Sequence, residues 1–145
     1  MVTVVSACLM GIYCRYDGGH RLDERVLKLQ ERGKLIPLCP EQLGGLPIPR
    51  PPAEVVGGLG GDVLDGRAKV VDAEGKDVTP QFLEGAKKAL KIIEESGAEK
   101  VIMKEKSPSC GVHKIYRNGV IVPGKGVLTA LLFREGIEVI SNEDL

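Results

Sequence analysis

The chain has 145 residues, of which 43% are hydrophobic and 28% charged, and its 20 basic side chains balance its 20 acidic ones. This length accommodates one hydrophobic core of ordinary size, so we expect residues 1–145 to form a single domain. The balanced charge gives no electrostatic reason to expect a membrane surface or a large nucleic acid as partner. No apolar run is long enough to span a bilayer.

The first residues, MVTVVSACLMG, lack the basic region of a signal peptide, and their apolar stretch predicts a buried strand over residues 2–8. We therefore expect a cytoplasmic protein, in a reducing compartment where cysteines serve more often as metal ligands or catalysts than in disulfides. Residues 22–32 carry apolar side chains at helical spacing, and Gly33 marks the end of that helix. A second short buried strand at 35–38 leads into Cys39.

Residues 43–66 are dominated by glycine and proline, so we expect neither a regular helix nor a central strand there. Such long loops are either lids and binding loops or surface excursions, and we favour a lid because the segment follows Cys39 directly. Residues 68–79 predict a hairpin that turns at Glu74–Gly75. Thr79 and Pro80 then predict a helix start, with Thr79 as N-cap, and the helix runs to Gly97.

The rest of the chain continues the alternation of strands and helices. We expect a strand at residues 100–105, a hairpin around Asn118–Gly119, a helix at 127–134 and a final strand at 137–140. This order predicts an α/β protein with a mainly parallel, three-layer sheet of Rossmann-like or flavodoxin-like type, with Gly/Pro-rich insertions and hairpins.

Three of the four cysteines, Cys8, Cys39 and Cys110, follow apolar runs that predict strands. Ligands bind at the carboxyl ends of the strands in open parallel sheets, and right-handed crossovers would bring these thiols to one edge. Converging thiolates suit zinc or an iron–sulfur centre, and three of them leave one coordination position open. Because no C-x-x-C pair is present, any one of these cysteines taken alone is better explained as a small buried hydrophobic side chain. Their shared position, where a strand enters a Gly- or Pro-rich loop, favours a common site.

Three separated motifs carry a resemblance that spans nearly the whole chain: SACLMG-x-x-CRYDGG, CPEQLGGLPIPRPPAE and KEKSPSCG. Together they resemble the bacterial and archaeal family that includes thiouracil desulfidase. The resemblance implies a 4Fe-4S cluster held by Cys8, Cys39 and Cys110, whose open iron binds the sulfur of a thiolated pyrimidine, a small-molecule substrate. It further implies a non-redox desulfidase, in which water replaces the sulfur and sulfide leaves through a cluster-bound intermediate.

Two further residues match the proposed active site of that family, Glu41 and Ser107. The resemblance implies that Glu41 protonates the ring or activates water, and that Ser107 orients water or substrate by hydrogen bonding. Without the motif, Glu41 would be interpreted as an exposed loop acid. Ser107 would be interpreted as a turn residue before Pro108.

Several neighbouring residues leave alternatives open. We expect Cys14 to be a neighbour of Cys8 without a ligand role; the alternative is a fourth ligand that closes the cluster. Arg15 fits a contact with polar groups of the substrate, and Ser109 fits a turn cap. Arg50 is interpreted either as a contact for an anionic group of a nucleotide or as a solvated side chain.

Two other functions remain open from the sequence. One is a non-catalytic four-cysteine zinc or iron–sulfur protein with a structural or sensing role, and the other is a metal-free domain that binds a small molecule. The number of essential cysteines discriminates between the enzyme and the four-cysteine protein, since three essential cysteines favour the enzyme and four favour the closed module.

Overall fold

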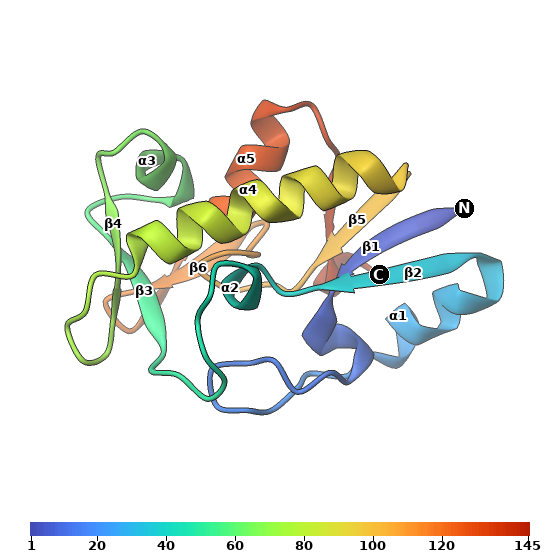
Figure 1. Ribbon diagram of the computed structural model, residues 1–145, viewed down its shortest axis with the longest axis horizontal. Coiled ribbons are helices and arrows are strands. Elements are labelled where there is room, and N and C mark those ends of the chain that lie inside the picture. The colour runs from blue at the N-terminus through green and yellow to red at the C-terminus, as the bar shows by residue number, and fades with distance from the viewer.

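The computed structural model describes residues 1–145, and a sheet of four parallel strands forms its centre (Figure 1). In sheet order these strands are β2 (Lys34–Leu38), β1 (Val2–Ser6), β5 (Lys100–Met103) and β8 (Val139–Ser141). The first strand lies inside and the second at the edge, as in flavodoxin-like sheets, which bind ligands where the strand order reverses. The predicted α/β class with a mainly parallel sheet is confirmed.

Helices cover both faces of this sheet, so the predicted three layers are present. The long helix α4 (Thr79–Ser96) and α5 (Val127–Arg134) lie on one face, and α1 (Glu24–Leu27) with the 3-10 helix η2 (Lys28–Arg32) lies on the other (Figure 1). Side chains alternate along a strand, and in β1 Val4 therefore enters the larger apolar core while Val5 enters the smaller one. None of the helices combines the length and the apolar character that crossing a bilayer requires.

Shorter elements are attached to this framework. They are η1 (Ala7–Met10), α2 (Pro40–Leu43), β3 (Ala53–Val56), α3 (Gly60–Leu64), β4 (Lys69–Asp72), β6 (Lys114–Arg117), β7 (Val120–Pro123) and η3 (Asn142–Asp144). The pairs β3–β4 and β6–β7 form two antiparallel ribbons beside the main sheet.

The expectation that residues 43–66 contain no regular helix is wrong, because the segment contains the short helix α3. The expectation of no central strand is correct, since the strand β3 belongs to a two-stranded ribbon. The prolines of the segment are confined to residues 47–52, and the residues that follow include β-branched valines that pair with β4. Helix α3 begins among glycines because the Asp62 carboxylate accepts the backbone N–H of Leu59 at 2.9 Å.

The two predicted hairpins have different outcomes. The second is confirmed: Asn118 and Gly119 adopt φ values of 52° and 76°, as a two-residue turn with positive φ requires. In residues 68–79 the chain does turn back at Glu74–Gly75, and an antiparallel bridge joins Val71 to Asp77, but the ladder partner of the strand β4 is β3. The period-2 pattern thus predicts the strand correctly but not its partner.

The helix starts also differ from expectation. The N-cap of α4 is Val78 rather than Thr79, whose hydroxyl instead accepts the N–H of Val70 at 2.8 Å and ties the helix to β4. The predicted end is confirmed, since Gly97 caps the helix with φ of 69°. The helix expected over 22–32 is shorter and becomes a 3-10 helix after Leu27.

Candidate functional site

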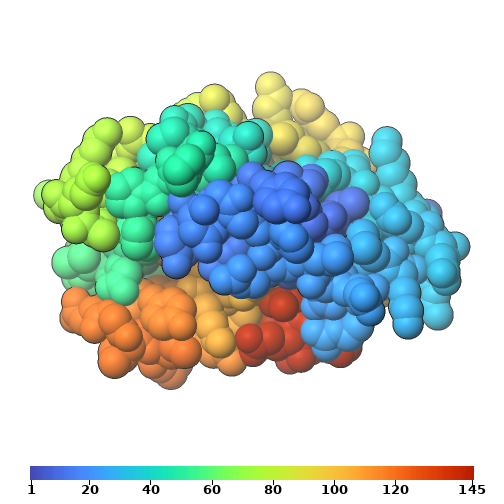
Figure 2. All heavy atoms as spheres, turned by 90° about the horizontal axis from the view of Figure 1, so that it is seen from below, coloured from blue at the N-terminus to red at the C-terminus, as the bar shows by residue number.

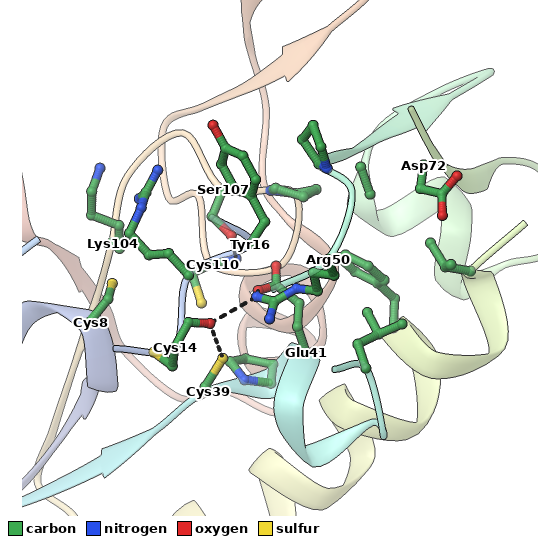
Figure 3. A pocket seen from close by; sticks show the side chains of 18 of the residues that line it. Cys8, Cys14, Tyr16, Cys39, Glu41, Arg50, Asp72, Lys104, Ser107 and Cys110 are labelled. Carbon is green, nitrogen blue, oxygen red and sulfur yellow. Dashed lines mark hydrogen bonds and ion pairs between the residues drawn. The ribbon is translucent and has the colours of Figure 1, made fainter. Parts of the chain in front are cut away.

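The carboxyl ends of three adjacent strands bring together the three cysteines that the sequence singled out. Cys8 lies in η1 directly after β1, Cys39 follows β2 as the N-cap of α2, and Cys110 lies in the loop after β5. All three line one cleft of about 640 Å³. In Figure 3 the cysteines gather at one end of the cleft, and Asp72 lies at the other.

Cys14 is the fourth cysteine in the same cleft, and its thiol lies near those of Cys8 and Cys39. Its carbonyl oxygen also lies 3.8 Å from the Cys39 sulfur, which donates to it. The structure therefore places four thiols, rather than three, along the cleft, which keeps the role of Cys14 open.

The protein environment favours the neutral form of three thiols at this site, those of Cys14, Cys39 and Cys110. The neighbouring Cys39 thiol lowers the pKa of Cys14, but the neighbouring Cys8 thiol and burial outweigh this effect and raise that pKa to about 11. The contact with Cys14 and burial together raise the pKa of Cys39 well above its ordinary value. Burial and the nearby Glu41 carboxylate raise the pKa of Cys110 to about 12. Metal binding must therefore release protons from these thiols.

Glu41 lies in the first turn of α2, two residues after Cys39, and its carboxylate is held from two sides. Its Oε2 forms an ion pair of 2.6 Å with the Arg50 guanidinium, and its Oε1 accepts a hydrogen bond of 3.0 Å from the Ser109 hydroxyl. Glu41 is therefore a half-buried carboxylate in the cleft wall and not an exposed loop acid.

Ser107 both supports its own turn and faces the cleft. Its oxygen accepts the backbone N–H groups of Ser109 and Cys110, each at 3.1 Å, and lies 3.0 Å from the Ser109 hydroxyl. Ser109 in turn lies within 3.6 Å of the Cys110 sulfur. A chain of hydroxyls thus connects Ser107 to the Glu41 carboxylate.

The loop that carries Ser107 and Cys110 is shaped by Glu105, a residue that sequence reasoning missed. This carboxyl group is 1% exposed, and its Oε1 accepts the backbone N–H groups of Val112, His113 and Lys114 at 2.7, 2.9 and 3.1 Å. The sequence contains no local signal for this role, because an acid after a strand is usually exposed.

One wall of the cleft is electropositive. Five basic side chains line the cleft without an ion pair to any acid, and four of them lie in the segments after β1 and β5: Arg15, Arg21, Lys104 and Lys106; the fifth is Lys76. The Nε of Arg15 is buried without a hydrogen-bond partner, and burial together with Arg15 lowers the pKa of Lys104. Unpaired cations at the wall of a concave site attract an anionic group.

The donor set can be compared with the metal centres that the sequence left open. No group of three or more His, Cys, Asp or Glu side chains is arranged to hold a single metal ion. The cleft nevertheless gathers soft sulfur donors, which suit iron–sulfur clusters. In such a cluster each thiolate binds a different iron, so its ligands lie farther apart than those of one ion. The arrangement fits a cluster better than a zinc ion.

The cleft lies where three distant parts of the chain meet on one face. In Figure 2 the segment after β1 (blue) crosses the middle of this face, with the teal and green Pro-rich segment above it and the orange hairpin β6–β7 below. Residues from all three regions line the cleft, among them Tyr16, Pro51 and Tyr116.

Comparisons with known proteins agree with the motif resemblance. Residues 3–144 match the family described as 2-thiouracil desulfurase. The protein YbbK of Bacillus subtilis (strain 168), described as uncharacterised, is 49% identical over 145 residues, covering 98% of this chain and 96% of that protein. A solved structure described as the 4Fe-4S-dependent thiouracil desulfidase TudS is 41% identical with a TM-score of 0.85, covering 99% of this chain and 91% of that one.

Proposed function

The chain belongs to the 2-thiouracil desulfurase family, and we propose that it replaces the sulfur of a thiolated pyrimidine by oxygen and releases sulfide. The observation that carries the proposal is the meeting of Cys8, Cys39 and Cys110 with Glu41 and Ser107 in one cleft. The similarity to a structure described as a 4Fe-4S-dependent thiouracil desulfidase supports it.

Cys8, Cys39 and Cys110 would hold the 4Fe-4S cluster through their sulfur atoms. When bound, the cluster supplies an open iron, a Lewis acid with affinity for the thiocarbonyl sulfur. The proposed reaction is hydrolytic: a thiocarbonyl and water give a carbonyl and hydrogen sulfide, so no electron is gained or lost. The residues of the chain must therefore bind the pyrimidine, orient water and move protons.

Glu41 is the group best placed to move protons. Its carboxylate takes a proton from water while the water oxygen forms its bond to the ring carbon, and it returns that proton as the carbon–sulfur bond breaks. Ser107 accepts two backbone N–H groups, so its own hydroxyl hydrogen remains free to donate to Ser109 or to a molecule in the cleft. This donor orients the water or the pyrimidine.

The electropositive wall extends the proposal to the form of the substrate. Arg15 and Lys104 face a cleft much larger than a pyrimidine ring requires, and neither is paired with an acid. A thiolated pyrimidine nucleotide would place its ring near the thiols and its phosphate against this wall. We therefore propose a nucleotide as a better substrate than the free base.

Sulfide release tests the proposed function directly. The protein is reconstituted with iron and sulfide without oxygen, supplied with 4-thiouracil or its nucleotide, and assayed for sulfide. We expect the wild-type protein to release sulfide. Cys110→Ser should lose both sulfide release and the cluster absorbance. Glu41→Gln should keep the cluster absorbance but release sulfide more slowly. If the cluster-loaded protein turns over neither 4-thiouracil nor its nucleotide, the proposed function is wrong.

The position of Cys14 favours one second candidate, a non-catalytic cluster protein with four cysteine ligands. It lines the same cleft as Cys8 and Cys39, and its carbonyl oxygen lies 3.8 Å from the Cys39 sulfur, as expected for a neighbour of the same ligand set. This function predicts that Cys14→Ser loses the iron–sulfur absorbance. The enzyme with three ligands predicts that the same variant keeps it.

A further inference from the structure

The ion pair between Arg50 and Glu41 differs from the other ion pairs of the protein in its burial. Their side chains are only 6% and 16% exposed, whereas each of the other pairs includes a side chain that is at least 35% exposed. The interpretation of Arg50 as a solvated side chain is therefore wrong. Burying two charges carries a large desolvation penalty, so removing one partner leaves an uncompensated charge in the cleft wall.

Arg50 also joins three segments that are separate in sequence. Its Nη2 donates to Glu41 and, at 3.0 Å, to the carbonyl oxygen of Cys14, and its Nη1 donates to the carbonyl oxygen of Pro47 at 3.2 Å. Its backbone N–H donates to the carbonyl oxygen of Tyr16 at 2.7 Å. Figure 3 shows the guanidinium beside the Cys14 carbonyl and the Glu41 side chain. A planar group with five N–H donors can make such contacts together, and a lysine cannot.

The two oxygens of Glu41 are used on opposite sides, one by Arg50 and the other by the Ser109 hydroxyl. Rotation of the carboxylate would break one of these contacts. Its orientation toward the cleft is therefore fixed before a substrate enters, and preorganisation of this kind lowers the barrier of the chemical step.

We propose that Arg50 is a positioning residue for desulfuration, which holds the Glu41 carboxylate at the reacting atoms and keeps the Cys14 segment against α2. The proposal rests on the proposed desulfidase function. Three guanidinium N–H groups of Arg50 already donate to acceptors of the protein, so we assign it this positioning role rather than contact with an anionic substrate group.

The test compares Arg50→Ala and Arg50→Lys with the wild-type protein, all loaded with the cluster. Arg67→Met is the matched control, since it removes an arginine–carboxylate pair at the surface, where Arg67 is 67% exposed. We expect Arg50→Ala to keep the cluster absorbance and the KM for 4-thiouracil and to lose about 10²-fold in kcat, as for a misplaced catalytic group. We expect Arg50→Lys to be intermediate and the control to be unchanged.

Rescue separates positioning from a general loss of structure. Millimolar guanidinium should enter the space left in Arg50→Ala and restore part of its kcat, while the wild-type kcat does not rise. The proposal is overturned if cluster-loaded Arg50→Ala has the wild-type kcat. It is also overturned if Arg50→Ala loses kcat and guanidinium does not restore any of it. If Arg50→Ala does not fold, Arg50→Lys decides: a lower kcat at an unchanged KM supports the proposal, and wild-type kcat overturns it.

Crystal structures of the metal-free proteins give an answer that does not depend on activity. We expect Glu41 to leave Ser109 in Arg50→Ala and to return to it in crystals soaked with guanidinium. If the Glu41 carboxylate keeps its hydrogen bond with the Ser109 hydroxyl in Arg50→Ala, the proposal is overturned. If the loaded wild-type protein releases no sulfide, the proposed function fails, and these structures still decide whether Arg50 orients Glu41.

Discussion

Removing the Glu105 carboxylate should loosen the loop that carries Ser107 and Cys110. In Glu105→Ala, the backbone N–H groups of Val112, His113 and Lys114 lose the acceptor that they share. Glu105→Gln keeps an oxygen at the same place but loses its charge. The two variants therefore separate the contribution of the acceptor from that of the charge.

The expected magnitude follows from the burial of these donors. An unsatisfied buried donor destabilises the fold by about 1–3 kcal/mol. Val112 is buried, Lys114 is half-buried and His113 is exposed, so water can reach part of the set. We expect a loss of about 3–5 kcal/mol for Glu105→Ala and of about 1 kcal/mol for Glu105→Gln. The larger loss is a substantial part of the roughly 5–15 kcal/mol that stabilises a typical domain.

Urea denaturation of the metal-free, reduced proteins measures these losses, followed by circular dichroism. The midpoints should fall from wild type to Glu105→Gln to Glu105→Ala, with an unchanged dependence of the free energy of unfolding on urea. Glu94→Gln, an exchange on the exposed side of α4, is the control and should leave the midpoint unchanged. A Glu105→Ala protein within about 1 kcal/mol of wild type would refute the reasoning.

The same residue sets a pH dependence. Burial alone would raise the pKa of Glu105, but the nearby Ser141 hydroxyl and the hydrogen bonds from the three backbone N–H groups outweigh it and lower the pKa below its ordinary value of 4.5. A lowered pKa stabilises the fold above the ordinary value, and this contribution is lost as the pH falls through the folded-state pKa. The stability difference between wild type and Glu105→Gln should therefore shrink below pH 4.5, and a constant difference would contradict this account.

Three further predictions concern the cleft and its supports. A methyl group in Gly85→Ala would overlap the Pro40 carbonyl oxygen, so its urea midpoint should fall, whereas Gly61→Ala meets only a flexible side chain and should not. Cys14→Ser should keep both the iron–sulfur absorbance and sulfide release, and loss of both would show a fourth ligand. Arg15→Met should raise the KM for a thiolated nucleotide by about tenfold or more, because it removes a charge-assisted hydrogen bond to the phosphate. The KM for the free base should stay unchanged. Equal changes of KM for both substrates would contradict a phosphate contact.

The parts of the fold that the sequence predicted correctly are those with local signals. The turn residues Asn118 and Gly119 need no distant partner, and the apolar runs before Cys8 and Cys39 predict strands from their own composition. The first of these strands is buried as predicted, whereas β2 is a partly exposed edge strand. The place of the cleft follows from the same strands, because the ends of neighbouring parallel strands share one edge.

The contacts of Glu41 are beyond such signals. Arg50 lies nine residues away among prolines, and Ser109 lies 68 residues away after another strand. No periodicity relates these positions, so only the folded chain shows that the acid has a buried cation on one side and a hydroxyl on the other. Glu105 is similar, because its partners are backbone groups that carry no residue identity.

The partly incorrect expectation for residues 43–66 has the largest consequence for the site. Residues 46, 47 and 50–54 line the cleft, and the strand pair β3–β4 continues its wall as far as Asp72. Prolines prevent this stretch from joining a helix or the main sheet, so it follows a path that only tertiary contacts can hold. Arg50 supplies those contacts through the Cys14 and Tyr16 carbonyl oxygens and the Glu41 carboxylate. The residue that fixes the path of this segment is therefore also the one that orients the Glu41 carboxylate.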